Sequence, residues 1–295
     1  MRRTSISAVI FILSALLLGS CGGSPADKPA AKRQGIITLA PHLTETVFAL
    51  GQGPRVIAVG SFCDYPPEIA SLPKVGGYLD PDLERITMLS PELLIIPGKH
   101  DKVAAYAKLH HMATLSVDMD SLATIDSGIA EIGRALQCVE AANTLRARIH
   151  EELESVRKSV AEMPRKKVLI VTGRTDHNLN ALFTANGKSF VSQVVEVAGG
   201  DNIFRDAPEV YFEASKEKVV LDAPDVILEF HAGERLTQEE RAAYVADWAR
   251  LPSLPAVKEG RICVILEPHA LRPGPRVAEV ARIIAARMHG DTNGS

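Results

Sequence analysis

The feature that most constrains the fold of this chain is the alternation of short apolar runs with helix-like segments. The runs are four or five residues long and rich in Val, Ile and Leu, as is typical of strands buried on both faces. Strands separated by helices indicate a parallel sheet. The predicted strands cover residues 35–39, 56–60, 93–96, 114–117, 167–171, 226–230 and 262–266. The predicted helices cover residues 41–50, 83–89, 102–109, 189–198, 216–221 and 276–288.

One sequence pattern occurs in both halves of the chain. Residues 83–96 read LERITMLSPELLII, and residues 215–228 read SKEKVVLDAPDVIL. Each predicts a short helix with an early Glu, followed by Pro, an acidic residue and a buried strand. Two equivalent lobes follow from this repeat, and the cleft between them is the natural place for a ligand.

The segment between the two halves has the spacing of one long helix. Apolar residues recur at helical intervals from residue 127 to 163, with no Pro and with Gly only at 128 and 133, and Pro164 ends the run. The predicted fold is therefore α/β, with two Rossmann-like lobes and parallel sheets joined by one long, rigid interlobe helix. The predicted boundaries are 35–126 for the N-terminal lobe, 127–164 for the helix and 165–290 for the C-terminal lobe.

The N-terminus has the pattern of an export signal. Arg2 and Arg3 precede an apolar run over residues 6–18, which is short for a membrane span and typical of a signal peptide covering residues 1–20. Leu18-Gly19-Ser20-Cys21 resembles the lipobox of bacterial lipoproteins, which implies lipidation of Cys21. Residues 21–34 then form a flexible tether. We expect an exported protein, lipid-anchored to a bacterial membrane and facing the periplasm or the cell exterior; the alternative is a plain signal peptide with an incidental Cys.

Composition excludes some classes of protein. The net charge is −3 and no dense basic segment occurs, which argues against nucleic-acid binding. Without Cys21 three cysteines remain, Cys63, Cys138 and Cys263. An odd number does not make a disulfide framework, so we expect buried free thiols, with one bridge as the alternative.

Several phrases spread over both halves carry a family resemblance. They are Ile37-Thr38-Leu39-Ala40-Pro41 with Thr44-Glu45, Asp64-Tyr65-Pro66-Pro67, Leu83-Glu84-Arg85-Ile86, Phe183-Thr184 with Gly187-Lys188, Gly199-Gly200 with Asn202-Ile203-Phe204, Ser215-Lys216-Glu217, and Pro275-Arg276. In their order and spacing, residues 36–286 resemble the iron-siderophore, haem and cobalamin binding proteins of bacterial ABC importers, and most of all the cobalamin-binding member. The resemblance implies a class III periplasmic-binding fold and a monomer that delivers a small-molecule ligand to an ABC permease and ATPase complex.

The resemblance also implies a cleft lined with aromatic side chains that stack on a large flat ligand. The matching positions are Phe62, Tyr78, Phe183 and Tyr211, whereas Tyr65 is an alternative candidate with a structural role. Tyr78 and Tyr211 stand where the cobalamin binder has Trp. Two further aromatic positions hold Pro97 and the segment 268–270. The cleft is thus less aromatic than that of the cobalamin binder, and the expected cargo is a corrinoid or an iron chelate, with no cofactor of the protein's own.

His269 and Arg272 lie in a loop after a predicted strand, which is where α/β proteins bind ligands. A His ring can coordinate cobalt or iron, and Tyr78 can ligate haem iron. Arg272 and Arg174 can pair with acidic groups of a ligand. Three other histidines also occupy loops or helix starts, namely His42, His100 and His177. The alternative is that all of these are ordinary loop residues, and no metal site of the protein's own is predicted.

Glu84 and Glu217 are the expected contacts to the permease. In the family that the sequence resembles, one exposed Glu on each lobe docks into a basic pocket of the permease, and these two residues match. Two distant carboxylates on one face set register and steer association. The alternative is that each merely favours a helix N-terminus through the helix dipole.

Motifs of enzymes are incomplete in this chain. Gly187-Lys188-Ser189 lacks the earlier Gly of a phosphate-binding loop, and His150-Glu151 lacks the second His of a metalloprotease helix. No Gly-x-Ser-x-Gly elbow occurs. We therefore expect a binding protein and not an enzyme. Three hypotheses stand: a corrinoid carrier, a ferric siderophore or haem carrier of the same fold, and, more distantly, an exported metal-dependent hydrolase.

Overall fold

The N-terminal lobe is built on a parallel sheet of four strands. The computed structural model describes residues 35–98 and 100–290. Four strands pair in the order β2-β1-β3-β4, and their bounds are Ile36–Thr38 (β1), Val56–Val59 (β2), Leu93–Pro97 (β3) and Thr114–Val117 (β4). The helices of this lobe are α1 (Pro41–Ala49), α2 (Leu83–Leu89) and α3 (Asp101–Leu109). These elements confirm the predicted ones within one or two residues at each end.

The C-terminal lobe repeats the scheme with additions. A second parallel sheet has the order β10-β9-β5-β7, from β5 (Lys166–Val171), β7 (Gly200–Asn202), β9 (Val226–Phe230) and β10 (Ile262–Ile265). A small antiparallel pair joins β6 (Phe183–Ala185) to β8 (Tyr211–Glu213). The helices are α6 (Phe190–Val197), α7 (Lys216–Asp222), α8 (Gln238–Asp247), α9 (Pro255–Lys258) and α10 (Val277–His289).

The sequence did not predict β6, β7, β8, α8 or α9. The three strands are each three residues long, and β7 reads Gly-Asp-Asn, which has no apolar pattern. In α8 only Tyr244 is fully buried, so that helix lacks an apolar stripe. Short or weakly amphipathic elements give no periodic signal, and tertiary packing decides them.

The prediction of a single helix over residues 127–163 was wrong. The chain forms α4 (Leu122–Ala135) and α5 (Val139–Ser159), and these two helices pack against each other. The break falls at Gln137, whose φ is 58°, and the Cys138 N–H donates to the Gly133 carbonyl at 2.8 Å. A Cβ on Gly133 would lie 2.4 Å from the Cβ of Ala142, so glycine lets the second helix approach closely. Glycine here marks a close contact and not merely a tolerated position in one helix.

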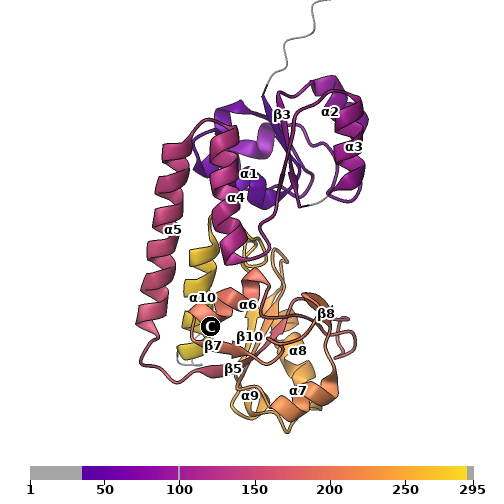
Figure 1. Ribbon diagram of the computed structural model, residues 1–295. Coiled ribbons are helices and arrows are strands. Elements are labelled where there is room, and N and C mark those ends of the chain that lie inside the picture. The colour runs from indigo at the N-terminus through magenta and orange to yellow at the C-terminus, as the bar shows by residue number, and fades with distance from the viewer. Residues whose placement is uncertain (1–34, 99, 291–295) are drawn as a thin grey trace, which may run out of the picture. The chain divides into compact units, whose positions relative to one another are not determined.

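Helix α5 is the long element that joins the lobes. Its 21 residues span about 30 Å. It packs on α4, which contacts α1 and β4 of the first lobe, and on α6 and α10 of the second lobe. Figure 1 shows α5 running along one side of both lobes. One apolar core continues through both, since it includes Leu43, Ile129, Ile149 and Ile284. The predicted fold class, two α/β lobes with parallel sheets joined by a long helix, is confirmed, with the helix shortened to α5.

Two further sequence expectations concern cysteines and membrane segments. Cys63, Cys138 and Cys263 are free thiols; Cys63 is buried and the other two are partly buried. Burial raises the pKa of the Cys63 thiol, which accepts a hydrogen bond from the Thr44 hydroxyl at 3.2 Å. Within residues 35–98 and 100–290, no helix has the length and apolar character needed to cross a membrane. The predicted signal peptide and Cys21 lie outside the described residues.

Candidate ligand-binding cleft

Exposed aromatic rings gather where strands of the N-terminal lobe end. Phe62 follows β2 and is 72% exposed, and Tyr78 lies in the loop of residues 76–80 and is 39% exposed. The Phe62 ring lies against this loop, since a Cβ on Gly77 would be 3.2 Å from a ring carbon. His100, which follows β3, meets the Tyr78 ring edge-on at 5.0 Å between centroids, and its Nε2 lies 2.6 Å from the Tyr78 carbonyl oxygen. The loops after β2 and β3, the two strands on either side of β1, thus form one aromatic wall.

The C-terminal lobe has a second pair of exposed rings on the small antiparallel sheet. Phe183 pairs with Glu213, and Ala185 pairs with Tyr211. Phe183 and Tyr211 are therefore diagonal neighbours on one face of β6 and β8. Each is 48% exposed. Desolvation, with the nearby Asp120 carboxylate, raises the pKa of the Tyr211 phenol to about 12, so the phenol stays protonated at neutral pH.

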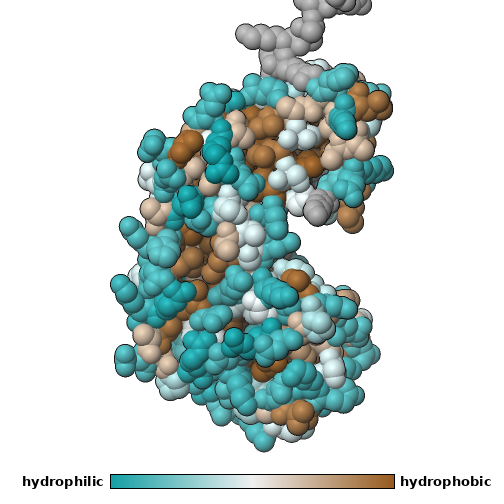
Figure 2. Space-filling model, viewed as in Figure 1, coloured by the Kyte–Doolittle hydropathy of each residue, from teal (hydrophilic) through white to brown (hydrophobic). Residues whose placement is uncertain are grey.

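The two lobes leave a hollow between them in the space-filling view. Figure 2 shows this hollow opening on the right, below the N-terminal lobe, and Figure 1 places β8 beside it on the lobe below. Asp120 lies between β4 and α4, and its carbonyl accepts a 2.7 Å hydrogen bond from the Phe190 N–H at the start of α6 in the C-terminal lobe. The charge of Asp120 acts on the Tyr211 phenol, which indicates that the second aromatic pair lies near this contact between the lobes.

Charged residues of the two lobes meet in an interlobe junction, formed by Glu45, Asp64, Arg272 and Arg276. Arg276 donates two hydrogen bonds to the Glu45 carboxylate, at 2.7 and 2.9 Å. Arg272 donates two to Asp64, at 2.5 and 2.8 Å, and reaches Glu45 at 3.4 Å. The Glu45 side chain is 2% exposed, and the hydrogen bond from Arg272 lowers the pKa of the Asp64 carboxyl. Arg276 also stacks on the Tyr65 ring at 4.1 Å.

Two residues that the sequence assigned to the ligand, Arg272 and His269, lie at this junction. Arg272 is already paired across the lobes, and His269 is 6% exposed, with burial and the Arg276 charge lowering its pKa. His42 at the start of α1 packs on the same turn, and burial lowers its pKa to about 4. The structure thus places Arg272, His269 and His42 together at the junction. Contact of Arg272 and His269 with a ligand stays a prediction.

Arg174 belongs to a buried charge network inside the C-terminal lobe. Its Nε donates to Glu229 at 2.7 Å, its Nη1 donates to Asp247 at 3.0 Å, and its side chain is 1% exposed. The Glu229 carboxylate also accepts from Trp248 Nε1 at 2.7 Å and lies 2.9 Å from His231 Nε2. All of these groups are satisfied by one another, so the suggestion that Arg174 pairs with ligand is wrong. Its buried guanidinium links the loop after β5 to Glu229 in β9 and Asp247 at the end of α8. His177 stacks on Tyr244 at the edge of this network.

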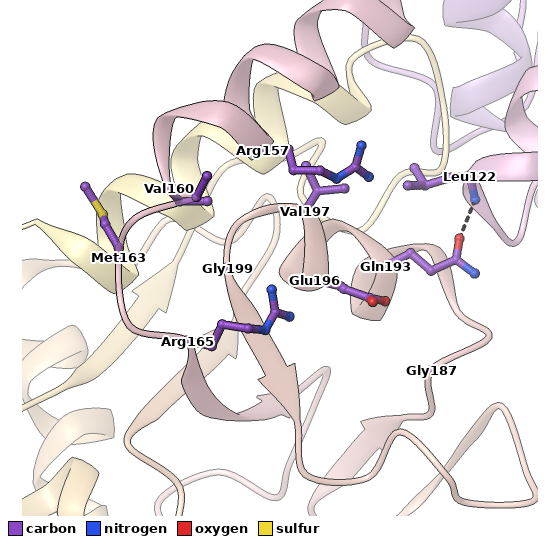
Figure 3. A pocket seen from close by; sticks show the side chains of 11 residues that line it. Leu122, Arg157, Val160, Met163, Arg165, Gly187, Gln193, Glu196, Val197 and Gly199 are labelled. Carbon is purple, nitrogen blue, oxygen red and sulfur yellow. Dashed lines mark hydrogen bonds between the residues drawn. The ribbon is translucent and has the colours of Figure 1, made fainter.

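A separate cavity lies away from the aromatic walls. It measures about 490 Å³ and is lined by α6, the residues before β5 and the C-terminal end of α5. Figure 3 shows Arg157, Arg165 and Glu196 among its lining side chains, with Gln193 bonded to the Leu122 N–H. Arg165 is held by Asp201 and by the Gly200 carbonyl. None of the residues predicted to bind ligand lines this cavity.

The two glutamates predicted to dock a permease are both exposed on short helices. Glu84 is the second residue of α2, and Glu217 is the second residue of α7. The Ser215 hydroxyl donates to Glu217 at 2.7 Å and lowers the pKa of its carboxyl. No cluster of three or more metal-ligating side chains occurs among the described residues.

The sequence signalled the aromatic walls but not the pairing at the junction. Thr44-Glu45, Asp64-Tyr65 and Pro275-Arg276 all stood among the phrases that carried the resemblance. The contact between Glu45 and Arg276, however, joins positions 231 apart, and no local pattern reveals such a pair. His100 and Asp120, the neighbours of Tyr78 and Tyr211, gave no signal beyond their places after strands.

Two parallel-sheet lobes, a joining helix and exposed rings at the ends of their strands define a two-lobed small-molecule binding protein. The family model described as periplasmic binding protein matches residues 36–268. The chain therefore belongs to the periplasmic binding protein family.

Similar proteins come from several bacteria. The vitamin B12-binding protein of Pectobacterium carotovorum subsp. carotovorum (strain PC1) is 26% identical over 269 residues, covering 89% of this chain and 91% of that one. Among solved structures, the periplasmic vitamin B12 binding protein of Vibrio cholerae is 24% identical, with a TM-score of 0.72 over 86% of this chain and 96% of that one. The periplasmic haem-binding protein of Roseiflexus sp. RS-1 in apo form is also 24% identical, with a TM-score of 0.72 over 87% and 98%. The two structures share the fold with this chain.

Proposed function

We propose that this protein captures a corrinoid, cobalamin or a close relative, between its two lobes and delivers it to an ABC permease. The observation that carries the proposal is the set of four exposed rings, two on each lobe: Phe62, Tyr78, Phe183 and Tyr211. Large rings left in water on both sides of a hollow provide stacking surfaces for a broad, flat ligand, and such stacking releases ordered water from both partners. The similarity to vitamin B12-binding proteins along most of the chain supports a corrinoid.

A second candidate is haem or a ferric siderophore, and Tyr78 favours it. A phenol oxygen is a hard ligand that binds iron in some haem proteins. The Tyr78 ring is partly exposed, and His100 holds the loop through the Tyr78 carbonyl while its ring contacts the phenol ring. A fixed phenol at the edge of a cleft is suited to an iron centre, whereas a corrinoid requires only the ring face.

The test is a titration of the purified chain, residues 33–295, with cyanocobalamin, cobinamide, haem and a panel of ferric siderophores. We expect each chain to bind one molecule of a corrinoid. Haem and the ferric siderophores are expected to bind at least about a hundredfold more weakly, a difference of about 2.7 kcal/mol in binding free energy. Tyr78→Phe separates the candidates: it removes an iron ligand, and so abolishes the phenolate band of bound haem, but keeps the stacking surface. Tight haem binding sensitive to Tyr78→Phe would replace the corrinoid with an iron chelate, and no binding of any probe would contradict the proposal.

We further propose that Glu84 and Glu217 dock the loaded protein onto the permease. Their positions agree, since each is the second residue of an exposed helix and the two helices occupy equivalent places in the lobes. Glu84→Gln with Glu217→Gln is expected to lower uptake while leaving ligand affinity unchanged. A loss of ligand affinity in this double variant would assign the two residues to the cleft instead.

We also propose that Cys21 carries a lipid that keeps the protein at the membrane. The proposal is supported by the small residues before Cys21 and the polar, Pro- and Ala-containing stretch after it. Metabolic labelling with a palmitate analogue is expected to mark the wild-type protein but not Cys21→Ala, which is expected to leave the membrane fraction. Labelling that persists in Cys21→Ala would contradict the anchor.

A further inference from the structure

Helices α2 and α7 match in length, in capping and at several corresponding positions. Each is seven residues long, begins after a side chain that caps its third N–H (Asp82 and Ser215), and ends before a residue with a φ of 47°. Each has a Glu at its second position and a basic residue at its third. The residues at the fourth position, Ile86 and Val219, are fully buried. The two helices therefore present equivalent outer faces, one on each lobe (Figure 1).

Each outer face also carries an apolar side chain in water. The sixth residue is Met88 in α2 and Leu221 in α7, and these are 71% and 82% exposed. Residues four apart lie on one helix face with Cβ atoms about 6 Å apart, so Met88 adjoins Glu84 and Leu221 adjoins Glu217. The sixth position points about 160° away from the buried fourth one, which directs both side chains outward.

A single exposed apolar side chain needs no explanation, but a matched pair at one helical position in two lobes is different. The lobes differ elsewhere on these helices: α7 begins with Lys216, where α2 has Leu83, and Lys218 pairs with Asp222 at 2.6 Å. What the two outer faces share is a carboxylate and, one turn later, an unbranched or γ-branched apolar side chain. The shared features point to one kind of contact made twice.

We propose that Met88 and Leu221 are the apolar half of the permease-docking surface, each filling a hydrophobic pocket one helical turn from the cation that receives Glu84 or Glu217. This proposal rests on the proposed docking of those glutamates. The partner is a membrane permease whose outer face repeats a basic group next to an apolar pocket at two places. The carboxylates steer and orient the encounter, whereas burial of the apolar side chains holds the complex.

The ionic and the apolar contacts of such a surface differ in how their binding strength depends on salt. Ionic contacts at an exposed surface weaken as the screening length falls from about 10 Å at 0.1 M salt to about 3 Å at 1 M. Burial of apolar surface does not weaken in this way. Binding that persists at high salt is therefore the part contributed by Met88 and Leu221.

The first experiment places a photo-crosslinking amino acid at position 88, 221 or 139 of the full chain in its own bacterium. Val139 is also exposed, but it begins α5, outside both outer faces. Positions 88 and 221 are expected to crosslink to one permease subunit, identified by mass spectrometry, and position 139 to nothing. Crosslinks from 88 and 221 to other proteins, or none, would overturn the proposal.

The second experiment measures binding of the purified chain to membrane vesicles from the same bacterium lacking this protein. Met88→Ser with Leu221→Ser is expected to weaken binding at least tenfold at 0.1 M salt and to remove it at 1 M. Glu84→Gln with Glu217→Gln is expected to weaken binding at 0.1 M only, and Val139→Ser not at all. Unchanged ligand affinity confirms that each variant is folded.

The outcomes separate this proposal from the function beneath it. If the serine variant binds vesicles like the wild type while the glutamine variant is weakened, the apolar half is wrong and the docking glutamates stand. If the wild type binds neither vesicles nor any ligand of the panel, the transport function itself fails.

Discussion

The aromatic walls of the cleft and the interlobe junction both contain residues that the sequence assigned to the ligand, yet the two regions are built in opposite ways. The walls carry rings that are between 39% and 72% exposed and, apart from Tyr78 and His100, make few polar contacts. The junction carries four charges that satisfy one another across the lobes, with the central Glu45 carboxylate buried. The rings of the walls remain exposed to solvent, whereas the charged groups of the junction are paired with one another across the lobes.

This contrast teaches how to judge a predicted site residue. A residue at the end of a strand is placed where ligands bind, but only its unused contacts tell whether it serves a ligand or the fold. Phe62 and Tyr211 are exposed to solvent, whereas the Arg272 guanidinium donates hydrogen bonds to Asp64 and Glu45.

Glu45→Ala gives the largest expected effect, because it leaves two guanidiniums without their shared carboxylate. Removal of one partner from a buried ion pair costs about 3–5 kcal/mol. We expect a loss of that size in the free energy of unfolding, measured by urea denaturation. The control is Glu92→Ala, which breaks the exposed pair with Arg55 and is expected to cost at most about 1 kcal/mol. Equal effects at both sites would show that the junction does not stabilise the fold.

The double variant Phe62→Ala, Tyr211→Ala is expected to lower ligand affinity while leaving the stability of the fold nearly unchanged. It removes one ring from each wall, so ligand affinity is expected to fall at least about a hundredfold, which is about 2.7 kcal/mol. The unfolding free energy is expected to change by no more than about 0.5 kcal/mol, since the rings are exposed. Leu109→Ala, a change at a 74% exposed residue of α3, serves as the control. An unchanged affinity in the double variant would remove the cleft assignment.

His42 is expected to give the junction a dependence on pH. Its pKa is lowered from 6.5 to about 4 by burial and by Arg272, so the folded state favours the neutral ring. The contribution of the neutral His42 ring to the free energy of unfolding is complete above pH 6.5. It is lost as the pH falls from 6.5 to 4, because the unfolded chain takes up the proton first. We expect a fall on the order of 2 kcal/mol in that window, absent in His42→Gln. A wild-type curve that is flat between pH 6.5 and 4 would contradict the burial of His42.

Gly274→Ala gives the smallest expected effect and tests the fit between the lobes. A Cβ at this position would lie 3.2 Å from the His42 Cβ and 3.4 Å from its Cα, so α1 and the turn before α10 must separate slightly. We expect a loss of about 1 kcal/mol in stability with ligand affinity changed by less than threefold. A large loss of affinity instead would indicate that the junction sets the width of the cleft.

The sequence predicted every strand of the two parallel sheets except β7, because the other strands carry strong local signals. The run of residues 226–230 is β9 itself, and all of its residues are buried. The break at Gln137 was missed because no Pro marks it and because the apolar spacing continues into α5. The reason for Gly133, close approach to Ala142, is a contact between helices and leaves no trace in local spacing.

The candidate site divides in the same way. The family resemblance indicated Phe62, Tyr78, Phe183 and Tyr211, and the structure leaves all four exposed. The Arg272 guanidinium is paired with the Asp64 carboxylate, which lies 208 positions away in the sequence, and no sequence pattern links the two residues. Exposure and pairing are properties of the folded chain, so the sequence alone does not distinguish the exposed candidates from the paired ones.

The most direct measurement is hydrogen–deuterium exchange of the chain with and without saturating cyanocobalamin. We expect new protection in the backbone around Phe62, Tyr78 and Tyr211, in both lobes at once, and little change at α4 and α5. Protection confined to one lobe, or centred on the cavity beside Arg157 and Arg165, would contradict binding between the aromatic walls.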